Sequence, residues 1–516
     1  MKKSFYLMAA LLVAMVGCNK EPQQGGPDSQ DGKLYMQFSV NMLTTRTGTD
    51  GEEEYPSDAT PDFEVGKDRE NTISKVDIVL TNDAGAYVVA DNVVPSAAAK
   101  DTYVAAFNSL LLSAGTTYDV YVYANCEAPT AKDIDQVSTE SVANITKDNN
   151  FWMTNAYAPE EVTLPTDLSP YTQPHNPLNL KSHYVERSMA RFDYMPKGPY
   201  TLGDGVQVTL TEAALINQSK AFYMLRRVSE DGTNTNWVQG GLESKINYVV
   251  DTDYATKANG YDASLIGNFD YHMTAPDGWA WKSIAQADLG EVDSWEGTDD
   301  GTDDPIADGT DADGEPEHSL NDYYIWQYAK ENTIPGVAAQ QHGISTGVVF
   351  KGEITGDAVT AAGGETIYVF ENVLYGKWAD VVTASEATDA PATLVAAVNK
   401  IKAKEAPVAA DYAAAGFTGY KAENGKYYAY YYYWNRHNDN GDNINMGPME
   451  FAVVRNNVYK LCVDKIAKFG HPNPNDPDPI DPDPENPSDP DEEVNYYFTV
   501  TVKVLPWVVR VNHIEF

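Results

Sequence analysis

Apolar and polar residues alternate along several segments of this chain, a pattern typical of β-strands with one buried face. The clearest segment is 34–42, where Leu34, Met36, Phe38, Val40 and Met42 share one face. Further strand-like runs lie at 73–81, 86–94, 116–126, 346–354, 365–375, 425–434 and 449–466. Helical periodicity is limited to the neighbourhoods of 131–146 and 391–405. The pattern predicts a mainly β protein with two tandem antiparallel β-sandwich domains and few short helices.

A second alternating segment follows a proline-rich spacer at the C-terminus. The spacer, residues 471–493, has eight prolines in the 19 positions from Pro472 to Pro490, which favours extended polyproline II structure. At about 3.1 Å per residue it could span roughly 70 Å. Residues 494–516 follow, and their apolar strand positions are Phe498, Val500, Val502 and Val504, with Trp507 just after Pro506. No nearby segment obviously pairs with this strand, so we expect it to pair with another subunit.

Composition suggests the remaining boundaries. Residues 182–196 end in proline, so we expect a first domain over 47–197 and a second over 198–470. Within the second domain, residues 291–318 are acidic and of low complexity, which predicts a solvated loop. The run from Tyr427 to Tyr433 has aromatic residues on both faces, so it should lie between two packed layers rather than stack a ligand.

The N-terminal sequence predicts that the protein is exported. Residues 1–17 have two lysines and then a short apolar stretch, as in a signal peptide. Cys18 follows at once, and the sequence MVGC resembles a bacterial lipobox, which implies lipidation at Cys18 and a membrane-anchored protein. Residues 18–46 would then be a lipidated propeptide that includes strand 34–42. Cys126 and Cys462 lack CxxC partners and are expected to be buried free thiols.

The composition and the absence of known catalytic and metal-binding motifs argue against several classes of function. Acidic residues outnumber basic ones 76 to 36, and the net charge of −40 opposes nucleic-acid binding. The sequence has no zinc spacing, no P-loop and no nucleophile elbow. A calcium loop in the acidic insert would lack side-chain oxygens at its first and twelfth positions. We therefore expect no enzyme activity, no metal and no cofactor.

Several motifs together resemble the fimbrillin superfamily of type V pilus subunits. They are the lipobox, VERSMAR (185–191), VVRNNVYKL (453–461), the DP-rich spacer and FTVTVKVLPW (498–507). The resemblance covers both ends of the chain and several internal strands, and it is loose over residues 200–345. It implies that the two β-sandwich domains are transthyretin-like. It also implies an outer-membrane lipoprotein precursor that an arginine-specific protease cuts between Arg46 and Thr47. Removal of strand 34–42 would open an apolar groove, which the C-terminal strand of another copy would fill in a head-to-tail polymer.

The implied partners are other copies of the chain, anchor and tip subunits, and the protease. Strands 34–42 and 496–516 could instead be ordinary strands of one monomeric sandwich. The chain could also be a non-polymerising surface lipoprotein that binds glycan or host protein through its tyrosine-rich second domain, or an anchor or tip subunit. An anchor should keep its N-terminal segment and a tip need not donate a strand, so Arg46 and the tail together favour a shaft subunit. The donating half of the tail, 494–505 or 507–516, stays open.

Three arginines stand within the motifs that carry the resemblance: Arg187, Arg191 and Arg455. A binding role is one interpretation of them. The simpler interpretation, which we expect to hold, is that they form salt bridges or are exposed charges on strands.

Overall fold

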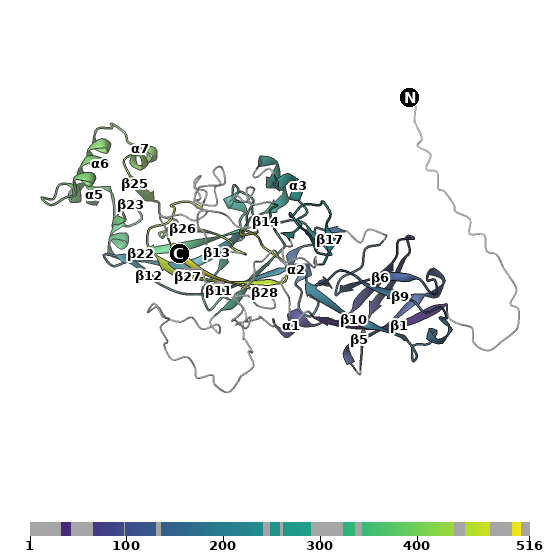
Figure 1. The fold of residues 1–516 in the computed structure, drawn as a ribbon. Helices are drawn as coiled ribbons and strands as arrows, with labels where there is room; N and C mark the ends of the chain where they lie inside the picture. Colours follow the sequence, from purple (N-terminus) through teal and green to yellow (C-terminus); the bar gives the residue numbers. More distant parts are fainter. Residues whose placement is uncertain are drawn as a thin grey trace, which may run out of the picture.

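A computed structural model describes residues 32–42, 66–97, 99–130, 136–240, 248–258, 262–289, 323–335, 343–437, 449–474 and 498–506. The predicted mainly β class is confirmed. Figure 1 shows two β domains placed end to end, with a small helical insert at the far end of the second domain.

The first domain is a nine-stranded sheet in the order β3-β2-β6-β8-β10-β1-β5-β4, with β9 paired to β6. Its strands are β1 (Lys33–Met42), β2 (Val76–Thr81), β3 (Tyr87–Val93), β4 (Pro95–Ser96), β5 (Ala99–Asn108), β6 (Thr117–Ala124), β8 (Met153–Asn155), β9 (Glu160–Thr163) and β10 (Leu178–Arg187). Contacts between β3 and β5 curl the sheet around its own apolar core. A curled sheet of this kind buries one face without a second layer.

The second domain is a sandwich of two sheets. One has the order β12-β13-β22-β26 with β20 on β13, and the other has the order β21-β11-β27-β28. The strands are β11 (Ala190–Met195), β12 (Tyr200–Gly203), β13 (Val206–Ile216), β20 (Lys282–Ser283), β21 (Tyr324–Ala329), β22 (Gly347–Thr355), β26 (Tyr427–Trp434), β27 (Asn457–Ile466) and β28 (Phe498–Pro506). Phe192, Tyr194 and Leu461 of one sheet pack with Val348 and Phe350 of the other in a single core.

The helical insert lies between β22 and β26. Its elements are α4 (Asp357–Ala362), β23 (Ile367–Phe370), β24 (Val373–Tyr375), α5 (Trp378–Ser385), α6 (Ala392–Lys402), α7 (Ala409–Ala414) and β25 (Phe417–Tyr420). It has its own core around Leu394, Val398 and Phe417. Helix α6 falls inside the predicted helical segment 391–405, so that prediction is confirmed.

Short elements complete the described parts of the chain. The paired strands are β7 (Val137–Ser138) with β15 (Phe222–Tyr223), β14 (Gln218–Ser219) with β19 (Phe269–Asp270), and β16 (Arg227–Ser229) with β17 (Val238–Gln239) and β18 (Tyr248–Val249). The helices are α1 (Asp68–Asn71), α2 (Val142–Ile145) and α3 (Tyr254–Lys257), with 3₁₀ turns η1 (Ser109–Leu111), η2 (Ser169–Tyr171), η3 (Ala263–Asn268) and η4 (Pro276–Gly278). In the described part of 131–146, where helical periodicity was expected, only the four residues of α2 are helical, and residues 137–138 form strand β7 instead.

The strand pairing differs in part from the antiparallel prediction. Two of the large sheets are mixed, because β1 pairs with β10 and β11 pairs with β27 in parallel. These partners are distant in sequence, and a long connection permits parallel pairing where a hairpin does not. The chain passes from the first apolar core to the second between Met189 and Ala190, where β11 joins the second domain's sheet.

Candidate functional site: a groove filled by the first strand

Strand β1 lies inside the first domain's sheet and is bonded along both edges. It runs antiparallel to β5, from the pair Lys33 and Asn108 to the pair Ser39 and Thr102. On its other edge it runs parallel to β10, from Met36 beside Leu178 to Met42 beside Val185. Removing β1 would therefore leave two facing, unpaired strand edges and a groove between them.

The apolar face of β1 is buried as its alternation predicts. Leu34, Met36 and Phe38 are 0% exposed and Val40 is 2% exposed, whereas Met42 is only partly buried. The intervening residues are half-exposed. The structure thus confirms a core strand here, with four anchoring side chains rather than five.

The groove walls come from β5 and β10. Tyr103, Ala105 and Phe107 point inward from β5 opposite Phe38, Met36 and Leu34, and all three are buried. The Phe38 ring lies 6.1 Å from the Phe107 ring and 5.6 Å from the His183 ring of β10, centroid to centroid. Our strand predictions missed β5, although Tyr103, Ala105 and Phe107 follow the period-two rule. Alanine at the central position weakens the apolar contrast on which that rule depends.

His183 is a polar side chain in this apolar wall. It is 4% exposed, and its Nε2 has no hydrogen-bond partner among the described residues. Burial lowers the pKa of His183, Lys181 lowers it further, and Glu160 raises it. Burial in this wall, beside the Phe38 ring, therefore disfavours the protonated imidazole.

The groove binds its strand with a large apolar area. Burial of four such side chains contributes about 1.5–3 kcal/mol each, or roughly 6–12 kcal/mol together before the entropy cost of ordering the strand. A whole domain is stable by only about 5–15 kcal/mol. A first domain without a strand in the groove would therefore be marginally stable, and it would favour any strand that restores the core.

The C-terminal strand pairs with its own chain in this structure. Strand β28 runs antiparallel to β27, from the pair Ile466 and Phe498 to the pair Asn457 and Pro506. We expected no nearby partner for it, because β27 lies across a long spacer from β28 in sequence. The predicted donor positions Phe498, Val500, Val502 and Val504 thus lie on the edge of the second domain's sheet, and Trp507 lies outside the described residues.

The junction between the domains contains buried ion pairs. Glu70 of α1 accepts hydrogen bonds from Arg191 of β11 at 2.9 Å and from the Tyr328 hydroxyl of β21 at 2.5 Å. The Arg191 guanidinium also bonds both carboxylate oxygens of Asp193 at 2.9 and 2.8 Å. Desolvation raises the pKa of Glu70, but the charges of Arg191 and Arg187 outweigh it, so the pKa is lowered overall.

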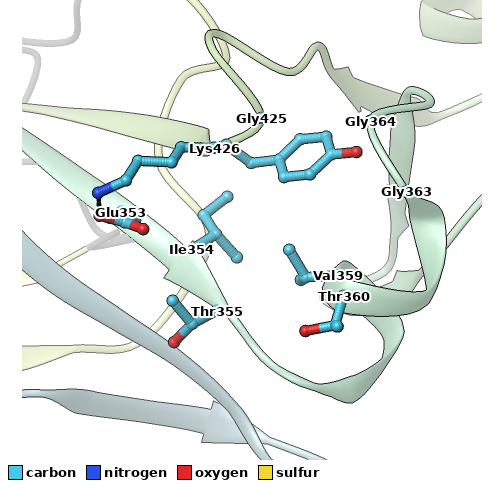
Figure 2. Close-up of a pocket in the computed structure, with 10 residues that line it drawn as sticks. Glu353, Ile354, Thr355, Val359, Thr360, Gly363, Gly364, Gly425 and Lys426 are labelled. Carbon is cyan, nitrogen blue, oxygen red and sulfur yellow. Dashed lines mark hydrogen bonds and ion pairs between the residues drawn. The ribbon is translucent and has the colours of Figure 1, made fainter.

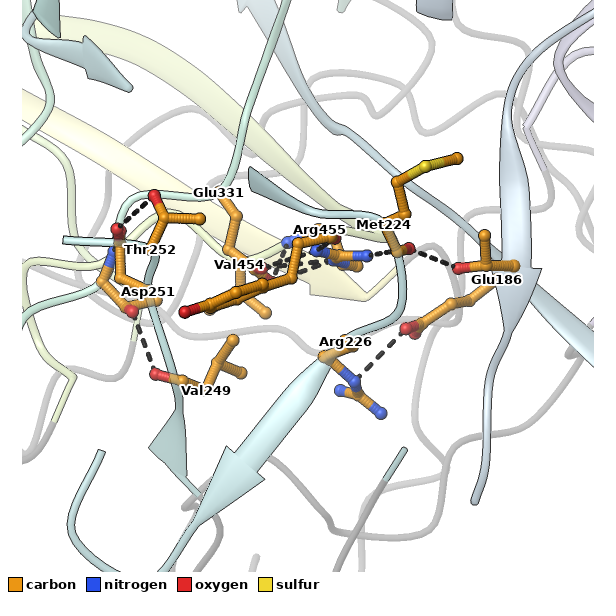
Figure 3. Close-up of polar contacts among 12 residues, drawn as sticks. Glu186, Met224, Arg226, Val249, Asp251, Thr252, Glu331, Val454 and Arg455 are labelled. Atoms are coloured by element: carbon orange, nitrogen blue, oxygen red, sulfur yellow. Dashed lines mark hydrogen bonds and ion pairs between the residues drawn. The ribbon is translucent and has the colours of Figure 1, made fainter. Parts of the chain in front are cut away.

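A second buried cluster lies nearby (Figure 3). Arg455 donates to Glu331 at 2.8 Å and to the Met224 carbonyl at 3.0 Å, and the Thr154 hydroxyl of the first domain donates to that same carbonyl at 2.8 Å. Arg226 pairs with Glu186 of β10 at 3.2 Å. Arg191 and Arg455 are therefore structural salt-bridge residues, as expected, and the buried Arg187 bonds Asn456. Their carboxylate partners Glu70 and Glu331 were not predicted, because nothing in their local sequence marks them.

The backbones of the two domains are also in close contact at the junction. Gly240 has φ +82°, and a Cβ there would lie 2.0 Å from the backbone nitrogen of Ala158. Only glycine fits such a position. The segment after β17 therefore packs directly against the backbone of the first domain.

The tyrosine run of β26 lies between packed layers, as predicted. Tyr427, Tyr431 and Tyr433 face the sandwich core, while Tyr430 packs near Trp281 on the other side, at 5.8 Å between ring centroids. A pocket of about 350 Å³ opens beside α4, where Lys426 pairs with Glu353 (Figure 2). Its one aromatic lining residue, Tyr427, is 2% exposed, so the pocket offers no open ring for stacking against a sugar.

Several predicted features fall outside the described residues: the signal peptide, Cys18, Arg46, Thr47, the acidic insert 291–318 and residues 475–493 of the spacer. Cys126 and Cys462 are buried free thiols, as expected. Burial raises the pKa of both thiols, which makes them poor nucleophiles. None of the described helices is long and apolar enough to cross a membrane.

Comparisons with solved structures find distant similarities only. Among solved structures, a fimbrilin from Porphyromonas gingivalis is 13% identical, with 93% of this chain and 98% of that chain covered and a TM-score of 0.37. The tip fimbrial protein Mfa3 of the same organism is 9% identical, with coverage of 84% and 95% and a TM-score of 0.32. A fimbrial assembly protein from Parabacteroides distasonis is 11% identical, with coverage of 63% and 99% and a TM-score of 0.24. These likenesses are too distant to assign a function to this chain.

The family comparison is more specific. No curated protein sequence matches this chain. Residues 423–513, however, match the model of the C-terminal region of fimbrillin, described as major fimbrial subunit protein type IV. That region contains β26, β27, β28 and the proline-rich spacer, which carry much of the resemblance found in the sequence. The fimbrillin resemblance is therefore confirmed for residues 423–513.

Proposed function

We propose that this chain is a structural shaft subunit of a surface fimbrium, and that it polymerises by protease-triggered exchange of strands and supports adhesion and biofilm formation. The observation that carries the proposal is β1, a strand in the interior of the first domain's sheet that is followed by a segment containing Arg46. Cutting there would separate β1 covalently from the rest of its domain. The precursor would be lipidated at Cys18 and held at the outer membrane, and the cut subunit would join a fimbrium.

The distribution of arginines supports selective cutting. Six of the seven arginines in the described residues are at most 6% exposed: Arg187, Arg191, Arg226, Arg227, Arg436 and Arg455. The seventh, Arg69, is partly covered and pairs with Asp148. An arginine-specific protease would thus find few sites in the folded domains.

The chain after the cut is anchored independently of β1. Helix α1 is the first element after residues 43–65, and its Glu70 is fixed at the domain junction by Arg191 and Tyr328. Loss of residues 18–46 would therefore empty the groove without unfastening the new N-terminal region.

The incoming strand would come from the C-terminal tail of another copy. The tail offers apolar alternation similar to that of β1, and main-chain bonds to β5 and β10 would provide affinity while the side-chain pockets set the register. Donation of 498–506 has to break its ladder with β27. Residues 507–516 are outside the described residues, so donation by that half of the tail stays the alternative. The contact is head-to-tail, so it propagates into a filament with anchor and tip subunits at its ends.

One experiment tests the proposal directly. Protein starting at Lys20 is treated with an arginine-specific protease, and its size is followed by electron microscopy and by SDS-resistant ladders. We expect filaments after cutting, and none from Arg46→Ala. Monomer that persists after complete cutting at Arg46 would overturn the polymer, and it would favour the alternative of a surface lipoprotein that binds glycan or host protein.

A further inference from the structure

Two adjacent leucines stand in solvent at one end of the first domain. Leu110 is 86% exposed and Leu111 is 55% exposed, both within the 3₁₀ turn η1. Leu110 is the most exposed large apolar side chain in the described part of the chain. Two adjacent exposed leucines form a small contiguous apolar patch, and covering such a patch with another apolar surface would be favourable.

The turn holds the two leucines outward. The Asn108 side chain accepts a hydrogen bond from the Leu110 backbone N–H at 3.0 Å, and Leu112 N–H donates to the Ser109 carbonyl at 3.4 Å. Leu112 is 7% exposed and belongs to the first domain's core. Leu112 therefore anchors the turn, and the conformation is set before any partner arrives.

This turn borders the mouth of the β1 groove. Asn108 pairs with Lys33 at the beginning of β1, and Ser109 N–H donates to the Gly32 carbonyl at 2.9 Å. A strand that keeps β1's pairing, antiparallel to β5 and parallel to β10, enters the groove at this end. The residues just before the inserted strand must then pass η1.

Both halves of the tail bring apolar residues to that position. If the strand starting at Phe498 is inserted, the preceding residues are 494–497, VNYY. If the strand starting at Trp507 is inserted, the preceding residues are 504–506, VLP. In each case valine with tyrosine, leucine or proline would meet the exposed leucines.

We propose that Leu110 and Leu111 form a docking surface for a second copy of this chain, which contacts the apolar residues directly preceding its inserted strand. This inference rests on the proposed strand exchange. It adds a contact outside the groove, where the incoming chain can be held while its strand pairs with β5 and β10. Contact at the mouth would raise the local concentration of the strand at the groove.

The test compares Leu110→Ser/Leu111→Ser with wild type as full chains beginning at Lys20. Val94→Ser is the matched control, because Val94 is 65% exposed in the same domain and lies outside η1. The uncut proteins should melt at the same temperature, since the substituted side chains are exposed. After cutting at Arg46, the initial rate of filament growth should fall at least about tenfold in the double variant and stay unchanged in Val94→Ser.

A binding measurement gives a second readout. Fluorescent peptides 494–506 and 504–516 are added to cut protein, and the one that binds wild type should bind the double variant about tenfold more weakly, equivalent to about 1.4 kcal/mol. Equal growth and equal peptide affinity in wild type and the double variant would overturn the docking surface while leaving strand exchange intact. If wild type neither grows filaments nor binds either peptide, the proposed function fails and the docking surface with it. Loss of binding to a glycan or lipid vesicle, with filament growth unchanged, would assign the leucines to another partner and also overturn the inference.

Discussion

Phe38 is the side chain whose truncation most directly tests how the groove holds its strand. It is fully buried, opposite Tyr103 and between the rings of Phe107 and His183. Phe38→Ala removes the ring and leaves a cavity that rigid sheet neighbours cannot close. Such substitutions cost about 3–5 kcal/mol. That is roughly a third to a half of the 6–12 kcal/mol that the four buried side chains of β1 contribute.

The cut protein makes this loss measurable as a rate. After cleavage at Arg46, fragment 20–46 is held only by non-covalent contacts, and its release can be followed by size-exclusion chromatography with a fluorophore on residue 20. Every 1.4 kcal/mol corresponds to about a factor of ten. If the loss falls on the bound state, Phe38→Ala should release the fragment about 10²- to 4 × 10³-fold faster than wild type.

Gln37→Ala is the matched control, because Gln37 occupies the half-exposed face of the same strand. This substitution should cost less than about 1 kcal/mol of stability, and the fragment should be released at a rate within a few-fold of wild type. Release of the Phe38→Ala fragment at the wild-type rate would refute the reasoning, since the apolar face would then not be what retains β1. Urea unfolding of the uncut proteins should rank the variants in the same order.

Three further outcomes follow. Burial lowers the pKa of His183 below its ordinary 6.5, so the unfolded chain takes up the proton first and stability falls as the pH drops below about 6.5. Between pH 7.5 and pH 5.5, His183→Leu should lose less free energy of unfolding than wild type, as measured by urea titration. An equal loss in the two proteins would show that His183 does not cause the pH dependence. Glu331→Gln leaves Arg455 buried without its carboxylate and should cost about 3–5 kcal/mol by thermal or urea unfolding. Lys402→Gln is its control, because it breaks the exposed pair with Glu386 and should cost under about 1 kcal/mol. Equal losses of stability in Glu331→Gln and Lys402→Gln would contradict an effect of burial on the charge. Deletion of 494–516 removes β28 from β27 and should lower the melting temperature, whereas deletion of 507–516 should not, and equal effects would show that β28 adds little to the second domain.

The strand content and the first strand's buried face could be predicted from local pattern. The alternation of Leu34, Met36, Phe38 and Val40 has one physical solution, because a side chain on every second residue points to the same face of a sheet. The burial of the run from Tyr427 to Tyr433 was predictable for a similar reason, since aromatic residues on both faces need two layers to cover them. The match of residues 423–513 to the fimbrillin C-terminal model agrees with the motifs quoted from that part of the chain.

The carboxylate partners of the arginines could not be predicted. Glu70 meets Arg191 across 121 positions of sequence, and Glu331 meets Arg455 across 124. A buried charge has to be paired, but its own neighbourhood does not say with which residue. Strand β5, one wall of the groove, could not be predicted for a similar reason. Ala105 is a small residue opposite Met36, and this role becomes visible only once β5 is paired with β1.

The sequence by itself determined which residues of β1 face the core and that a proline-rich spacer lies between the last strand and the segments that precede it in the chain. Both depend on near-neighbour rules, the period of the strand and the fixed φ of proline. Only the tertiary structure decided that β1 lies in the interior of its sheet and that β28 lies on the edge of another. Strand neighbours are chosen by hydrogen bonds and side-chain packing between distant segments, which local pattern does not encode.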